Sequence, residues 1–172
     1  MTKVRAFCIG GLFGGALFNF SIGMKNLADE LNKIPGVSAT YEQNSFFPLA
    51  VVAGLIKAGI AAARYRALVF VGHSYGAEAA SWIASALWKL GIKVSLTVIV
   101  DTVITQSSVG ATGGDRILYY QRQDPMGGGN PPFDPGPGQT TAQKLNLNHV
   151  AMAMSKIIHK DVITRVTAIT KQ

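Results

Sequence analysis

Short apolar runs alternate along the chain with longer segments in which apolar residues recur every three or four positions. Runs of the first kind are typical of buried parallel strands, and segments of the second kind are typical of helices that cover a sheet. The pattern predicts strands at 4–9, 37–42, 67–71, 94–100 and 116–122, and helices at about 22–34, 48–64, 77–90 and 150–170. This alternation predicts an α/β fold: a three-layer α/β/α sandwich around a mostly parallel sheet of about five strands.

Local signals support several of these boundaries. Ser21 suits an N-cap of the first helix, Pro35-Gly36 suits its end, and Gly91 stands where the third predicted helix needs a left-handed C-terminal cap. Residues 123–139, in contrast, are dense in proline and glycine and are predicted to form neither helix nor strand. We expect a loop that folds over the mouth of a cleft, with a disordered linker as the alternative.

Length and hydropathy predict one domain over residues 1–172, because 172 residues with 48% hydrophobic side chains are enough to bury a core. No apolar stretch is long enough to predict a transmembrane segment. Lys3 and Arg5 ahead of residues 6–18 resemble a short signal peptide, but a first strand running into a glycine loop fits better. Cys8 is the single cysteine, which excludes an internal disulfide and suits a buried strand position. We therefore expect a cytoplasmic protein, with secretion as the alternative.

The formal net charge of +7 comes from basic residues that are scattered along the chain. No basic run is interleaved with aromatic residues, so no nucleic-acid partner is expected. Two explanations stay open: a solvated positive surface, and attraction of an anionic substrate or surface. The chain has no metal-ligand cluster and no nucleotide-binding fingerprint, so no metal and no cofactor are expected.

The strongest chemical signal is Gly-His-Ser-Tyr-Gly at 72–76, between the strand predicted at 67–71 and the helix predicted at 77–90. A Gly-x-Ser-x-Gly sequence in that position is the layout of a nucleophile elbow, where a strained turn exposes the serine hydroxyl. Ser74 is thus predicted to be the nucleophile of an acyl transfer through a covalent serine ester. The alternative is an ordinary strand-to-helix turn that contains a serine.

A serine nucleophile needs a base, and the chain has three histidines. His73 adjoins Ser74 and is expected to point away from the hydroxyl and to pack. His159 lies well inside the last predicted helix, where a solvated or packed role is expected. His149 follows the proline- and glycine-rich loop at the start of that helix, and we predict that it is the base.

Two aspartates are candidates for the acid that orients the histidine. Asp101 directly ends the apolar strand at 94–100 and emerges at the same sheet edge as Ser74, while Asp124 follows the next strand. We favour Asp101, because a charge that ends a buried strand must be paired, whereas Asp124 in Gln-Asp-Pro suits a turn. Asp124 stays the second choice. Asp115 lies at the wrong end of its strand, and Asp134 lies deep in the loop.

Stabilising the oxyanion of a tetrahedral intermediate requires two donors. The backbone N–H of Tyr75, at the start of the helix, is one candidate. The second is the N–H of Leu12 in the glycine-rich loop at 10–15, which follows the first strand. Phe13 in the same loop, with Met126 and Phe133 in the later loop, would supply apolar contacts to an acyl chain.

These residues resemble the α/β-hydrolase superfamily in a small form, similar to lipase-, cutinase- and thioesterase-like serine hydrolases. The resemblance rests on the glycine loop, the Ser74 elbow, Asp101 at a strand end and His149 near the last helix. It implies a Ser74-Asp101-His149 triad, oxyanion donors at Leu12 and Tyr75, and hydrolysis of small-molecule carboxylic esters or thioesters. The chain lacks an insertion large enough for a helical lid, which favours soluble or extended acyl substrates.

Two other functions stay open from the sequence. The first is a non-catalytic binding or interaction protein on a hydrolase scaffold. The second is a basic protein that engages an anionic surface, motivated by the net charge of +7.

Overall fold

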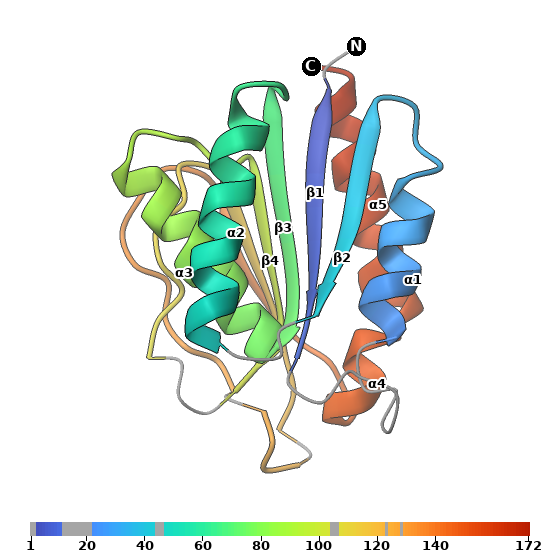
Figure 1. Cartoon of the computed structure of the whole chain (residues 1–172). Coiled ribbons are helices and arrows are strands. Elements are labelled where there is room, and N and C mark those ends of the chain that lie inside the picture. Colours follow the sequence, from blue (N-terminus) through green and yellow to red (C-terminus); the bar gives the residue numbers. More distant parts are fainter. Residues whose placement is uncertain (1–2, 12–21, 44–46, 104–106, 123, 128) are drawn as a thin grey trace.

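A computed structural model shows, in the residues that it describes, one sheet of six strands between two layers of helices (Figure 1). The structure describes residues 3–11, 22–43, 47–103, 107–122, 124–127 and 129–172. All pairings in the sheet are parallel, and the strand order is β2-β1-β3-β4-β5-β6. The strands are β1 Val4–Gly10, β2 Val37–Gln43, β3 Ala67–Ser74, β4 Leu96–Thr102, β5 Asp115–Tyr120 and β6 Thr140–Lys144.

Within the described ranges, five helices cover the two faces of the sheet. They are α1 Ile22–Leu31, α2 Phe47–Ala62, α3 Tyr75–Lys89, α4 His149–Ala153 and α5 Lys156–Thr170. α1, α4 and α5 lie on one side of the sheet, and α2 and α3 lie on the other (Figure 1). Buried side chains of the first three helices form one apolar cluster with the sheet, and those of α2 and α3 form the other. The predicted three-layer α/β/α architecture is therefore confirmed.

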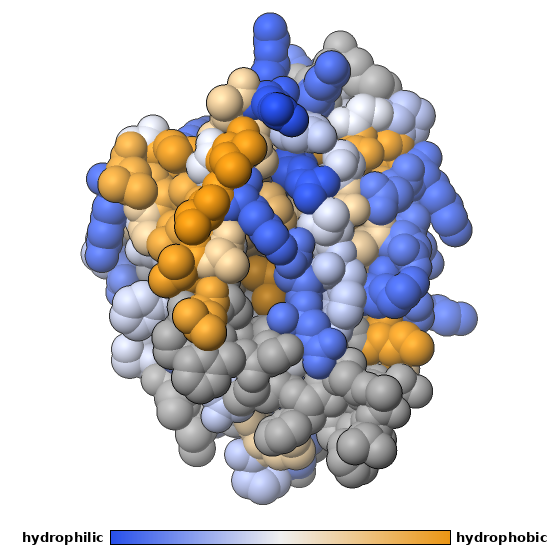
Figure 2. All heavy atoms as spheres, viewed as in Figure 1, coloured by the Kyte–Doolittle hydropathy of each residue, from blue (hydrophilic) through white to orange (hydrophobic). Residues whose placement is uncertain are grey.

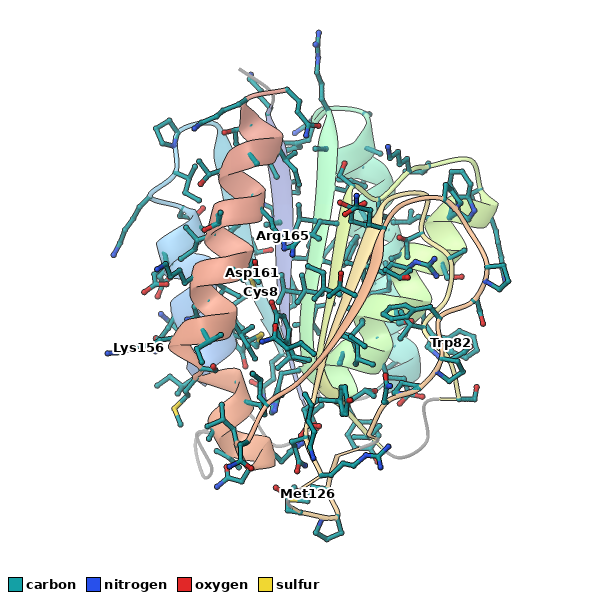
Figure 3. All side chains as sticks on the ribbon, turned by 180° about the vertical axis from the view of Figure 1, so that it is seen from behind. Cys8, Trp82, Met126, Lys156, Asp161 and Arg165 are labelled. Atoms are coloured by element: carbon teal, nitrogen blue, oxygen red, sulfur yellow. The ribbon has the colours of Figure 1, made fainter. Side chains whose placement is uncertain are left out.

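The apolar runs that predicted strands in the sequence correspond to the central strands of the sheet. In β3, every residue from Ala67 to His73 is buried, because β1 and β4 pair with its two edges and helices cover both faces. Cys8 lies on β1, fully buried as predicted, and burial raises the pKa of its thiol to about 12 (Figure 3). Gly91, after α3, has a φ of 80°, which confirms the predicted left-handed cap. Ser21 lies outside the described residues.

Two elements differ from the prediction. β6 was not predicted, because its sequence, Thr-Thr-Ala-Gln-Lys, is polar and all five residues are exposed at the sheet edge. The last helix was predicted as one element over 150–170, but the structure divides it into α4 and α5. Met154 caps the end of α4 and Ser155, with an extended backbone, precedes α5. Periodicity persists across this break, which is why the sequence suggested one helix.

The proline- and glycine-rich segment has no regular secondary structure in its described part, as predicted, apart from an isolated bridge between Phe133 and Val109. Arg116 of β5 holds this segment against the sheet. Its buried guanidinium donates to the backbone carbonyl of Asp134 at 2.7 Å and lies 5.5 Å from the centre of the Phe133 ring. Among the described residues, no helix combines the length and apolar character needed to cross a membrane.

Candidate active site

The turn between β3 and α3 holds Ser74 in a strained backbone conformation. Its φ is 61° and its ψ is −129°, a region that non-glycine residues rarely occupy. Both glycines of the pentapeptide permit close backbone approach: a Cβ at Gly72 would overlap the Gly76 carbonyl, and a Cβ at Gly76 would overlap the Ile9 carbonyl. The local geometry is that of a sharp strand-to-helix elbow.

Gly11, the residue that follows β1, lies directly against the serine side chain. A Cβ at Gly11 would lie 2.8 Å from Ser74 Cβ and 3.1 Å from Ser74 Oγ, so only glycine fits there without displacement. Ser74 itself is partly exposed, and Tyr75 is the first residue of α3. Leu12 and Phe13, which we predicted to donate to the oxyanion and to contact an acyl chain, lie outside the described residues.

His149 and Asp101 form a buried pair. His149 Nδ1 lies 2.7 Å from Asp101 Oδ2, and their side chains are 4% and 0% exposed. With the carboxylate ionised, Nδ1–H donates and Nε2 keeps its lone pair. Asp101 lies near the carboxyl end of β4 and has a φ of 41°, a second strained position. Because Ser74 pairs with Thr102 in the register of β3 and β4, the serine and the aspartate emerge at the same sheet edge.

Asp124, the second candidate for the acid, contacts the backbone of His149 and not its ring. Its Oδ2 accepts from the His149 N–H at 2.7 Å, while its Oδ1 accepts from the Met126 N–H and from Gln121 Nε2. Burial acts to raise the pKa of Asp124, but the backbone hydrogen bonds from His149 and Met126, the nearby charge of His149 and the Gln121 side chain together hold the pKa below its usual value. Asp124 therefore holds the backbone at the start of α4, together with the N-cap Asn148.

Gly127 lies against Asp101, a contact that the sequence did not indicate. A Cβ at Gly127 would lie 2.5 Å from Asp101 Oδ1 and 2.6 Å from Gln121 Nε2, so the turn after Asp124 covers the Asp101 carboxylate. Met126, in the same turn, is 55% exposed and lies at the tip of this loop (Figure 3). Phe133 packs against the α2 and α3 cluster, beside Arg116. The predicted acyl contacts of Met126 and Phe133 stay predictions.

The other two histidines pack. His73 is buried; its Nε2 donates to the His149 carbonyl at 2.8 Å, and the two rings lie 4.7 Å apart. Burial, followed by the proximity of His149, lowers the pKa of His73 to about 3, so its ring is neutral beside the His149 ring. His159 donates from Nε2 to the Ala153 carbonyl at 2.9 Å and joins α5 to α4. The neutral His73 ring supports the position of His149 without adding charge to the site.

His73 should make stability depend on pH. In the unfolded chain the pKa of His73 is close to 6.5, so its ring is protonated below that pH. In the folded protein the ring stays neutral down to about pH 3. The free energy of unfolding therefore falls as the pH drops through this window, by up to about 1.4 kcal/mol per pH unit from this residue, with no contribution above it. His73→Gln keeps an N–H donor and does not titrate. We expect its unfolding free energy, measured by urea melts below pH 6.5, to fall less steeply than that of wild type; parallel slopes would contradict this.

Comparisons with known proteins give the fold class. No known protein family and no curated protein matches the sequence. Among solved structures, the type II thioesterase BorB from the borrelidin biosynthetic cluster is 13% identical, with a TM-score of 0.61 over 97% of this chain and 92% of that one. Human thioesterase 2 is 11% identical, with a TM-score of 0.60 over 96% and 97% of the two chains. A thermostable esterase from Pseudomonas putida ECU1011 is 10% identical, with a TM-score of 0.54 over 96% of this chain and 72% of that one.

The chain has the α/β-hydrolase fold, over nearly its whole length, as the resemblance implied. Its structural neighbours include thioesterases and an esterase, and at these identities the similarity establishes the fold and not the reaction. Within the described ranges, no three His, Cys, Asp or Glu side chains lie close enough to hold a metal ion.

Proposed function

We propose that this protein is a serine hydrolase that cleaves carboxylic esters or thioesters through an acyl-enzyme on Ser74. The observation that supports this most is the buried contact of 2.7 Å between His149 Nδ1 and Asp101 Oδ2, at the sheet edge where the strained Ser74 ends β3. A buried histidine-aspartate pair beside an elbow serine is the arrangement that activates a hydroxyl.

The proposed reaction has two halves. Asp101 holds Nδ1–H of His149, so Nε2 accepts the proton from Ser74 as Oγ attacks the carbonyl carbon of the substrate. The oxyanion that forms takes hydrogen bonds from the backbone N–H groups of Tyr75 and Leu12. The intermediate then collapses, and the imidazolium gives its proton to the departing alcohol or thiol. Water, deprotonated by His149, attacks the acyl-enzyme in the same way, which releases the carboxylic acid and restores Ser74.

The proposal includes both esters and thioesters because the residues of the protein perform the same steps for each. An alcohol and a thiol each leave after receiving the proton held by His149. The names of the structural neighbours, two thioesterases and one esterase, agree with this pair of reaction classes. The substrate is a small-molecule acyl ester or thioester.

A fluorophosphonate probe tests the proposal directly. Its phosphorus reacts with an activated serine, so we expect one probe per chain, with the label on the peptide that carries Ser74 when the digest is read by mass spectrometry. Acid-denatured protein is the control and should stay unlabelled. If folded protein stays unlabelled at neutral pH, and short p-nitrophenyl esters are turned over no faster than by Ser74→Ala, the chain is a binding protein on a hydrolase scaffold.

A further inference from the structure

An apolar hollow lies beneath the first half of α2, between that helix, the sheet and α3. Its volume is about 360 Å³. The stacked rings of Phe7 and Phe70, 5.0 Å apart, line it on the sheet side, while Ala79 and Ile83 line it on α3. This volume falls within the range of small-molecule sites.

The packing of α2 explains why the hollow exists. Gly54 lets α2 approach α3 closely, since a Cβ there would overlap the end of the Ile83 side chain, and Ala58 and Ala61 are buried farther along. Nearer its start, Leu49 and Ala53 line the hollow, and both are exposed to solvent. The small residues Gly54, Ala58 and Ala61 thus set the close contact of α2, and the hollow lies along residues 49–57 of that helix.

The outer face of α2 is apolar as well. Leu49, Val52, Ile56 and Ile60 are between 54% and 68% exposed and follow one another along the helix (Figure 2). An apolar surface that continues into an apolar hollow offers a route for a chain that is itself apolar.

The hollow begins close to the candidate nucleophile. Ile9, which lines it, is two residues before Gly11, and Gly11 lies against Ser74. Ala79, on the other wall, is five residues after Ser74 on the helix that Ser74 precedes. At a rise of about 3.3 Å per strand residue and 1.5 Å per helix residue, Ile9 lies about 7 Å along the chain from Gly11, and Ala79 lies about 7 Å along α3 from Ser74.

The charged groups of the hollow lie at its rim and neutralise each other. Lys57 Nζ lies 2.5 Å from Glu42 Oε2, and the two side chains are 51% and 31% exposed. Apart from this pair and the exposed Gln43, the described residues that line the hollow are apolar or glycine. An occupant therefore needs no polar group at its buried end, which fits an aliphatic chain better than a sugar, a nucleotide or a peptide.

We infer that this hollow binds the aliphatic tail of an acyl substrate whose carbonyl carbon is attacked by Ser74. The inference rests on the proposed hydrolase function and makes the substrate class more specific: esters or thioesters of straight-chain fatty acids. Short acyl groups reach Ser74 without filling the hollow. Longer chains gain binding from each methylene that leaves water, which is worth about a fourfold gain in affinity.

A series of p-nitrophenyl esters from acetate to dodecanoate tests this. For wild type, kcat/KM should rise by up to about fourfold for each methylene that enters the hollow, and then level off. Ala53→Trp places a bulky ring in the hollow from α2 and should remove the rise, so that dodecanoate is turned over no faster than acetate. Val52→Trp places the same side chain on the outer face of α2 and should retain the rise. A flat series in wild type, or the same series in both variants, would overturn the inference while the hydrolase proposal stands.

A second measurement separates the two proposals. Decanoate should bind to Ser74→Ala, with its dissociation constant read by isothermal titration calorimetry, and this binding should be lost when Ala53→Trp is added. If no ester is turned over, acetate included, the hydrolase proposal fails, and decanoate binding alone decides whether the hollow takes an acyl chain. If circular dichroism shows that Ala53→Trp does not fold, Ala79→Leu fills the hollow from the opposite wall and takes its place.

Discussion

Ser74→Ala is expected to lower kcat for p-nitrophenyl acetate by about 10⁴- to 10⁶-fold, with a much smaller change in KM. The hydroxyl is the proposed nucleophile, and without it only direct attack by water on the bound ester is left. Alanine fits the strained turn as well as serine does, since both carry a Cβ, so the fold should persist. Initial rates over a range of ester concentrations, with circular dichroism as the check on folding, measure the effect.

Ser81→Ala is the matched control. Ser81 lies two turns farther along α3, and its hydroxyl accepts from the Gly110 N–H at 3.3 Å, away from the proposed triad. We expect kcat to change by less than about threefold, because this hydroxyl supports a loop and takes no part in the proposed reaction. Retention of more than a tenth of wild-type kcat by Ser74→Ala would mean that another group attacks the ester.

The elements that could be predicted from the sequence are the buried ones, because burial requires apolar residues at regular positions. β1, β3 and β4 are covered on both faces, so most residues in them are apolar. β6 pairs through its backbone at the sheet edge, where its side chains face water, and its sequence carries no such signal. The break between α4 and α5 is set by Met154 and Ser155, two residues within an otherwise continuous apolar pattern.

Part of the candidate site could be predicted from the sequence, because the alternation of strands and helices predicts a parallel sheet. Parallel strands present their carboxyl ends at one edge, and this brings the ends of β3 and β4, with Ser74 and Asp101, together. His149 was predicted as the base, and the structure places its ring against Asp101. The contacts of Asp124 and Gly127 depend on how a long loop returns to the sheet, which no local pattern encodes.

His73 shows the same limit on prediction. Its place in the pentapeptide indicated that it points away from the hydroxyl, but not that its ring lies against His149 and donates to the His149 carbonyl. That contact joins residues 76 positions apart in the sequence. It becomes visible only once α4 is packed beneath the end of β3.

Asp101→Asn is expected to lower kcat by about 10⁴-fold, whereas Asp124→Asn should lower it by no more than about tenfold. An amide at position 101 can donate to His149 Nδ1, which places the ring proton on Nε2 and leaves no lone pair there for the Ser74 proton. An amide at position 124 keeps an oxygen that accepts from the His149 N–H, so the start of α4 keeps its hydrogen bond. The kcat values of both variants for the same short ester, at neutral pH, measure the difference.

Asp115→Asn controls for the loss of a carboxylate as such, because Asp115 lies at the amino end of β5, where its Oδ1 accepts from the Gln139 N–H. Its kcat should stay within about threefold of wild type. The comparison between Asp101 and Asp124 is decisive because each touches His149 at a different atom, one at the ring and one at the backbone. A larger loss for Asp124→Asn than for Asp101→Asn would reassign the acid to Asp124, and would require the His149 ring to turn away from the buried Asp101 carboxylate during turnover.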